Sequence, residues 1–127
     1  MRTKRLPDAE FEIMENIWEM EEPVTTSMLM QRVGKQKGWK IQTVVSLFAR
    51  LTERGFLRVE KGQGRERDFY TVISRDEYLR METESFVNHY HKKSYLSLLN
   101  SLHRDQLTAE DLDELSAWVK EARKGGK

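Results

Sequence analysis

The sequence predicts a mainly α-helical protein that contains one small β-hairpin. Apolar residues recur at helical spacing through most of the 127 residues, which is typical of amphipathic helices. In the middle of the chain, strand-forming residues flank a Gly-x-Gly turn. In the C-terminal part, a Ser and a Thr each stand three positions before an acidic residue, which is the motif of a helix start. A chain of this length can bury a core without disulfides or metals.

The first helix is predicted to begin with Asp8 as its N-cap and to end near Met20, shortly before Pro23. Glutamates fill one face of this helix, so its apolar stripe is expected to pack into the core. The stripe consists of Phe11, Met14, Ile17 and Trp18.

A second helix is predicted after a short extended link that follows the proline. Thr25 or Thr26 can cap it, because a Thr hydroxyl accepts a hydrogen bond from the backbone of the first helical turn. We expect the helix to end near Gly34 or Gly38. Its apolar residues are Leu29, Met30 and Val33.

A third helix is predicted over residues 41–54, with Gly55 as the left-handed residue that ends it. Its apolar residues follow the i, i+3, i+4, i+7 pattern of a buried face. They are Val44, Leu47, Phe48 and Leu51. The opposite face carries Gln42, Val45, Ser46, Ala49, Arg50 and Glu53.

The hairpin is predicted over residues 56–72, because strand-forming residues flank a turn at Gly62 and Gly64. Three cations, Lys61, Arg65 and Arg67, are expected at its tip. Three helices followed by a two-stranded hairpin make a winged helix-turn-helix. We expect this domain over residues 1–73.

Residues 74–127 are predicted to form a helical dimerisation domain. Ser74 with Glu77 is a capping box, and Thr108 with Asp111 resembles one. The helices are amphipathic but too thin to bury their own apolar residues, and they lack the sustained heptads of a coiled-coil protein. We therefore expect a homodimer with two-fold symmetry. The predicted interface consists of Leu96, Leu99, Leu112, Leu115, Trp118 and Val119.

The charges are distributed unevenly along the chain, although the net charge is only +1. Residues 8–30 carry seven acids and no base, whereas residues 31–67 carry ten bases and three acids. A basic middle segment is expected of a module that binds the phosphates of DNA. The sequence contains no cysteine, which excludes disulfides, thiolate metal sites and cysteine nucleophiles.

The outer face of the third helix has the composition of a helix that enters the major groove, where small or polar residues let the backbone approach the bases. Gln42 and Ser46 can bond base edges, and Val45 can touch a thymine methyl group. Thr43 can reach a phosphate or a base, and Arg50 a phosphate or a guanine. The alternative is an ordinary surface helix beside a hairpin with solvated charges. The predicted DNA-binding residues are Lys40, Gln42, Thr43, Val45, Ser46, Arg50, Lys61, Arg65 and Arg67.

Several segments spread over nearly the whole chain match a known family in their order and spacing. They are LPDAEFEIM at 6–14 with Ile17 and Trp18, WKIQTVVSLFARL at 39–51 with GFL at 55–57, Gly64 and Arg65 with Tyr70, and DQLT at 105–108. By these segments the chain resembles the penicillinase-repressor family, which includes the methicillin-resistance and copper-responsive repressors. The resemblance implies a dimeric transcriptional repressor that binds palindromic operator DNA and controls a resistance or stress operon. It also implies DNA contacts from Gln42, Thr43, Ser46 and Arg50, with the hairpin on the DNA backbone.

The resemblance further implies how such a repressor is induced. In β-lactam-responsive members the helical tail is cut after an Asn, which points to Asn100 and Ser101 here and to a membrane sensor-protease as a partner. Ser101 departs from the family pattern, because a bulky apolar residue normally follows the cut. Copper-responsive members carry a C-terminal cysteine cluster. This chain has no cysteine, so copper sensing by that route is excluded.

Other classes of function have less support in the sequence. His89 and His91 project about 200° apart on a helix, so they are poorly placed to chelate one metal, and nothing gathers acids around a nucleophile. We therefore predict no enzymatic activity, no metal and no cofactor. The main alternative is a winged-helix protein-interaction module that meets an acidic partner through the basic segment. The basic N-terminus leads into no apolar stretch and no segment could span a membrane, so we expect a cytoplasmic protein without membrane insertion.

Overall fold

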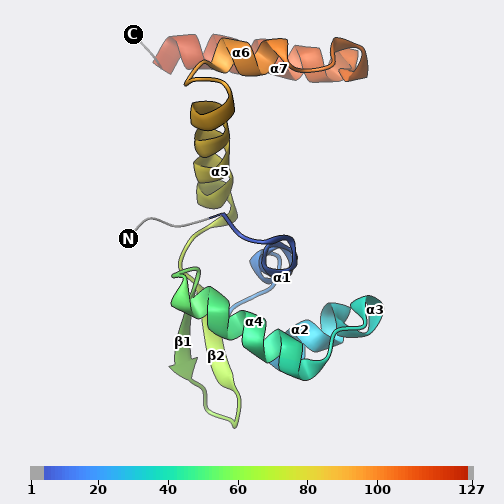
Figure 1. Cartoon of the computed structure of the whole chain (residues 1–127), viewed down its shortest axis with the longest axis vertical. Coiled ribbons are helices and arrows are strands. Elements are labelled where there is room, and N and C mark those ends of the chain that lie inside the picture. Colours follow the sequence, from blue (N-terminus) through green and yellow to red (C-terminus); the bar gives the residue numbers. More distant parts are fainter. Residues whose placement is uncertain (1–4, 126–127) are drawn as a thin grey trace. The chain divides into compact units, whose positions relative to one another are not determined.

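The computed structural model describes residues 5–125, and the ends of the two predicted domains at residues 1–4 and 126–127 lie outside this range. Helices dominate the fold, and the two strands form one antiparallel hairpin, as predicted (Figure 1). The described residues divide into two compact units, the first ending at Glu84 and the second beginning at Ser85. The first unit therefore extends past the domain boundary predicted at residue 73. The separate roles assigned to the two parts remain a prediction.

Helix α1 (Asp8–Trp18) begins one residue earlier than the sequence predicts. Pro7, not Asp8, stands at the N-cap, and its carbonyl accepts the first helical hydrogen bond from Phe11 N at 2.9 Å. The prediction of an Asp8 cap is wrong because a proline φ near −60° already suits the start of a helix, so Asp8 becomes the first helical residue. Ile13, Met14 and Ile17 of α1 are buried.

A second helical segment consists of α2 (Thr26–Leu29), a π-helical turn η1 (Met30–Gly34) and α3 (Lys35–Lys37). Thr25 is its N-cap, and the Thr25 hydroxyl accepts a hydrogen bond from Met28 N at 3.2 Å. Of the two predicted caps the structure has Thr25, and of the two predicted ends it has the one at Gly38.

Helix α4 (Ile41–Glu53) is the third helix, and its apolar stripe lies in the core as predicted. Val44, Phe48 and Leu51 are at most 1% exposed and Leu47 is 7% exposed. Gly55 follows the helix with a φ of 87°, a conformation that costs little for glycine, so the chain can turn back here into the hairpin.

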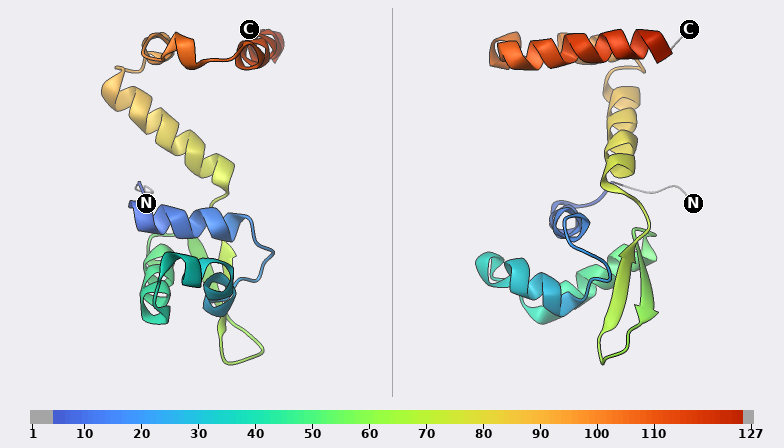
Figure 2. Two further views of the ribbon diagram at one scale, coloured as in Figure 1. Left: turned by 90° about the vertical axis from the view of Figure 1, so that its right-hand side faces the viewer. Right: turned by 180° about the vertical axis from the view of Figure 1, so that it is seen from behind.

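Strands β1 (Leu57–Lys61) and β2 (Arg67–Thr71) pair so that Leu57 lies opposite Thr71 and Lys61 opposite Arg67. The tip of the hairpin extends beyond the helices of this unit (Figures 1 and 2). Val24, expected only as part of a link, also bridges Phe69 of β2, with mutual backbone hydrogen bonds of 3.0 and 2.8 Å. The link before α2 is thus attached to the hairpin.

Aromatic side chains join the hairpin and the next helix to this core. Phe69 packs edge-on against Phe48 with ring centroids 4.8 Å apart, and Phe56 packs likewise against Tyr78 at 5.5 Å. Trp18 Nε1 donates a hydrogen bond to the Ile73 carbonyl at 2.9 Å. These contacts fix the hairpin relative to α1 and α4.

The C-terminal part contains α5 (Arg75–Tyr90), α6 (Tyr95–Asn100), a 3-10 turn η2 (Arg104–Gln106) and α7 (Ala109–Gly125). Both predicted capping motifs are confirmed, because Ser74 exchanges hydrogen bonds with Glu77, and Thr108 with Asp111. No helix within residues 5–125 combines the length and the apolar character needed to cross a membrane.

Candidate nucleic-acid interface

The exposed face of α4 consists of the polar and small residues that the sequence assigns to DNA. Gln42, Thr43, Ser46 and Arg50 are all exposed, and Val45 is 50% exposed. Among the described residues, no side chain hydrogen-bonds to the Gln42 amide or the Ser46 hydroxyl, so their donors and acceptors are available to a ligand. Because the opposite face of α4 is buried, these side chains must point away from the domain core.

Arg50 and Arg54, at the C-terminal end of α4, face a carboxylate of α1. Arg54 Nη1 lies 3.0 Å from Glu10 Oε1, and Arg50 Nη1 lies 3.9 Å from Glu10 Oε2. The Arg50 side chain remains 62% exposed, so it can still reach a phosphate. The sequence did not reveal Glu10 as a partner of these arginines, because the glutamates of this helix were predicted to lie on the face opposite its apolar stripe.

Acids in α1 and at its C-cap, Glu19, also neutralise cations of the basic middle segment. Arg32 pairs with Glu19, and Lys37 pairs with Glu12. In contrast, four cations at the start of α4 and on the hairpin form no ion pair within residues 5–125, and all four are exposed. They are Lys40, Lys61, Arg65 and Arg67. The charge that stays unpaired is therefore concentrated on the elements predicted to contact DNA.

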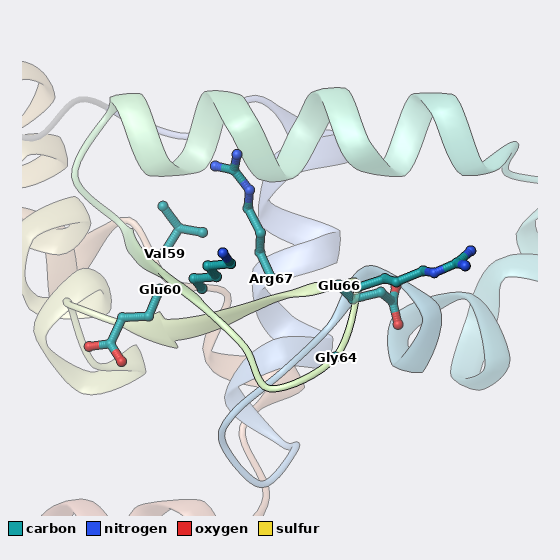
Figure 3. Close-up of a pocket in the computed structure, with 7 residues that line it drawn as sticks. Val59, Glu60, Gly64, Glu66 and Arg67 are labelled. Carbon is teal, nitrogen blue, oxygen red and sulfur yellow. The ribbon is translucent and has the colours of Figure 1, made fainter.

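The hairpin, or wing (residues 57–71), forms an open groove of about 480 Å³ near its tip. Lys61, Arg65 and Arg67 contribute cations to its lining, and Glu60 and Glu66 contribute acids. Figure 3 shows the Arg67 side chain extending from β2 in the direction of α4 and the Glu60 carboxylate pointing away from that helix. The wing thus presents positive charge beside α4.

Glu66 is a wing residue that sequence reasoning did not single out. Its Oε2 accepts three hydrogen bonds, from the Thr26 hydroxyl at 3.1 Å, from Ser27 N at 3.2 Å and from the Ser27 hydroxyl at 2.7 Å. The Ser27 hydroxyl bond is the main reason why the pKa of Glu66 lies below its usual value of 4.5, an effect that partial desolvation opposes. No local pattern predicts this contact, because 39 residues separate Ser27 from Glu66.

The predicted dimerisation residues lie on α6 and α7 and are all exposed, from 41% for Leu115 to 68% for Trp118. The predicted cleavage site lies at the end of α6. Asn100 is the last helical residue and Ser101 is its C-cap, with Ser101 N donating to the carbonyls of Ser97 and Leu98 at 3.2 and 3.0 Å. Both residues of this peptide bond are exposed.

Comparison with known sequences identifies relatives that match almost the whole length of the chain. The chain is 30% identical to the penicillinase repressor of Bacillus licheniformis over 122 residues, which cover 93% of this chain and 94% of that protein. It is 25% identical to the methicillin resistance regulatory protein MecI of Staphylococcus aureus (strain N315) over 115 residues, covering 90% and 92% of the two chains. Both relatives are regulators rather than enzymes, in agreement with the prediction that this chain is not an enzyme.

Comparison with solved structures supports the fold of the first unit. The solution structure of the DNA-binding domain of the repressor BlaI is similar with a TM-score of 0.52 and 25% identity, covering 61% of this chain and 92% of that domain. The monomeric form of Bacillus licheniformis BlaI in complex with the blaP half-operator gives a TM-score of 0.51 with 26% identity and the same coverage. These similarities confirm the predicted winged helix-turn-helix.

The family comparison agrees with the resemblance stated from the sequence motifs. The model described as Penicillinase repressor matches residues 6–121, which include α4, the wing and most of the C-terminal helices. The protein described here therefore belongs to the penicillinase repressor family.

Proposed function

We propose that this chain is a transcriptional repressor that reads operator DNA with α4 in the major groove and contacts the flanking backbone with the wing. One observation carries the proposal: α4, with its exposed polar face, lies beside the wing (Figure 3), and among the cations of residues 31–67 that form no ion pair within residues 5–125, all except Lys35 of α3 lie at the start of α4 or on the wing. Polar side chains read base edges, and unpaired cations bind phosphates. The half-operator complex of the related BlaI repressor supports the same use of this fold.

The residues divide by the kind of contact that we assign to them. Gln42, Thr43 and Ser46 lie in the first half of α4, which in this motif approaches the base edges, and Val45 lies among them. Arg50 lies in the last turns, where a phosphate contact is expected. Lys40, Lys61, Arg65 and Arg67 are assigned to the phosphates on either side.

We infer that the repressor works as a homodimer through α6 and α7. These helices expose apolar side chains that a single chain does not cover, among them Leu96, Leu99, Leu112 and Trp118. Removing such side chains from water contributes roughly 25 cal/mol per Å² of apolar surface, which favours association and offsets its entropic cost. A two-fold dimer also suits a palindromic operator that controls a resistance or stress operon.

Induction through another protein, a membrane sensor-protease, is part of the same proposal. The bond between Asn100 and Ser101 lies at the exposed end of a short helix, where the backbone can leave the helix at little cost. A DNA target implies a cytoplasmic location. Incubation with the cognate sensor and mass analysis of the fragments tests the cleavage, and an intact chain that still leaves the DNA would refute it.

The experiment that tests DNA binding starts with the full-length protein and random duplex DNA. Selected duplexes are sequenced, and fluorescence anisotropy then compares a selected duplex with a random one at several salt concentrations. We expect tighter binding to the selected duplex and affinity that falls with salt. Absence of binding to any duplex at every salt concentration would favour the alternative, a winged-helix module that binds an acidic protein.

A further inference from the structure

A cluster of hydrogen bonds joins the wing to the start of α2. The Glu66 carboxylate lies in the loop just before β2, yet its hydrogen bonds go to Thr26 and Ser27 rather than to the cations beside it in the sequence. Two of the three donors are hydroxyl groups and one is a backbone N–H. Hydrogen bonds to a charged acceptor are stronger than those between neutral groups, so this contact restrains the wing.

The position of Glu66 in the sequence links this contact to the wing cations. Arg65 and Arg67 are its direct neighbours, and neither forms an ion pair within residues 5–125. Arg65 precedes Glu66 in the loop and Arg67 begins β2, so a carboxylate fixed toward α2 restrains the backbone that carries both arginines. One anchored acid therefore limits the movement of the backbone on either side of it, and with it the positions of two cations.

At Gly62 the two sides of the wing's turn approach each other closely, so a restraint on Glu66 also acts on the start of the turn. A Cβ atom added at Gly62 would lie 2.8 Å from the Glu66 carbonyl oxygen and 2.9 Å from Asp68 Oδ1. The backbone at Gly62 thus approaches the far side of the turn more closely than a larger residue allows. Within this turn the Glu66 side chain supplies the hydrogen bonds to α2.

We propose that Glu66 is a positioning residue for DNA binding: its hydrogen bonds to Thr26 and Ser27 hold the wing so that Arg65 and Arg67 face the DNA backbone. The proposal rests on the proposed function. Repulsion between the Glu66 carboxylate and bound phosphates would, by itself, make removal of the acid strengthen DNA binding. Here the removal of the acid weakens binding instead, since the wing loses its orientation.

The test compares Glu66→Ala with a control that removes a different acid from the same hairpin. Glu60→Ala is this control, because among residues 5–125 the Glu60 side chain pairs only with Arg58, within the hairpin itself. Ser27→Ala removes the shortest hydrogen bond without changing the charge of the wing. Glu66→Gln keeps an acceptor oxygen and should recover part of the effect. Hydrogen exchange of the amides of residues 61–67 reports on the wing in the absence of DNA.

For Glu66→Ala we expect exchange in the wing that is about fivefold faster and operator affinity that is about fivefold weaker. The slope of log affinity against log salt should fall by about one to two phosphate contacts, which loss of overall stability would not cause. Ser27→Ala should change both quantities in the same direction, and the double variant should resemble Glu66→Ala alone. Glu60→Ala should leave the exchange rates unchanged and the affinity equal or higher.

Two results would overturn this role. Unchanged exchange in Glu66→Ala would mean that the carboxylate does not restrain the wing. Faster exchange with equal or tighter DNA binding would mean that the orientation of the wing does not matter for binding. A wild-type chain that binds no duplex would refute the proposed function and this role together, whereas the exchange rates would still decide whether Glu66 restrains the wing.

Discussion

Arg54 Nη1 lies 3.0 Å from Oε1 of Glu10, a carboxylate whose side chain is only 2% exposed. Within residues 5–125 this oxygen accepts no hydrogen bond, so the pair is a close ionic contact without hydrogen-bond alignment. Arg50 places a second positive charge near the other carboxylate oxygen, Oε2 of Glu10. The end of α4 is thus tied to the first turn of α1 by a buried acid and two partly exposed cations.

Replacement of Glu10 should therefore destabilise the protein more than replacement of a surface acid. Glu10→Ala should lower the free energy of unfolding by about 2 kcal/mol, because it removes the partner of two arginines and leaves a space in the core. Glu12→Ala is the matched control on the same helix; its surface pair with Lys37 should be worth less than about 1 kcal/mol. Urea unfolding measures both values, and equal losses would contradict the structural role of Glu10.

Tyr78 should make the stability depend on alkaline pH. Its hydroxyl accepts a hydrogen bond from Leu6 N at 2.8 Å and donates one to Glu82 at 2.7 Å. Burial, with help from the bond to Glu82, raises the pKa of Tyr78 from 10.0 to about 12. A raised pKa stabilises the folded state fully below pH 10, and this contribution is lost as the pH rises through about 12.

Tyr78→Phe should lower the free energy of unfolding by about 1 kcal/mol at neutral pH, because it removes both hydrogen bonds. The difference between wild type and variant should shrink as the pH rises from 10 towards 12. Urea unfolding at a series of pH values measures it. Tyr95→Phe, on an exposed residue of α6, serves as the control and should show no such trend. A difference that stays constant over this range would count against the raised pKa.

The features that could be predicted from sequence are those encoded within one or two helical turns. The buried stripe of α4 follows from apolar spacing, and the hydrogen bonds between Ser74 and Glu77 follow from a motif of four residues. The Asp8 cap was predicted wrongly because an acid after a proline suits both the cap and the first helical position. Here the proline took the cap.

The contacts that could not be predicted join residues far apart in sequence. Val24 bridges Phe69 through two backbone hydrogen bonds, and the carboxylate of Glu66 reaches the start of α2. Neither contact has a local pattern, because each depends on where the hairpin packs after the core has formed. The exposed residues of α4 that we assign to DNA could be predicted from the sequence for the opposite reason, since one helix carries them all.

The dimer should depend on the exposed apolar face of α7. Leu115→Glu should give a monomer at tens of micromolar, a concentration at which we expect the wild type to sediment as a dimer. The reason is that a charge in an apolar interface must be buried without a partner. Leu115 is 41% exposed in the single chain, so the helix content should not change. Glu114→Ala, on the neighbouring exposed position, is the control. A monomeric wild type would refute the dimer, and a dimeric Leu115→Glu variant would exclude this face from the interface.

Gln42 and Arg50 should contribute to DNA binding in different ways. Gln42 lies in the first turn of α4 with an amide that no side chain among the described residues engages, which suits bidentate bonding to a base edge. Gln42→Ala should cost roughly 1–3 kcal/mol on the selected duplex and little on random DNA. Arg50→Ala should weaken both duplexes together and lower the salt slope by about one contact.

The contact between Arg50 and Glu10 sharpens this prediction. An arginine that already faces a carboxylate at 3.9 Å must share its charge between the acid and a phosphate, so its loss should cost less than the loss of an unpaired cation. Arg65→Ala provides that comparison, because Arg65 forms no ion pair among residues 5–125. Anisotropy titrations with both duplexes at several salt concentrations measure all three variants. If Gln42→Ala left the ratio of specific to random affinity unchanged, the exposed face of α4 would not be the surface that reads the bases.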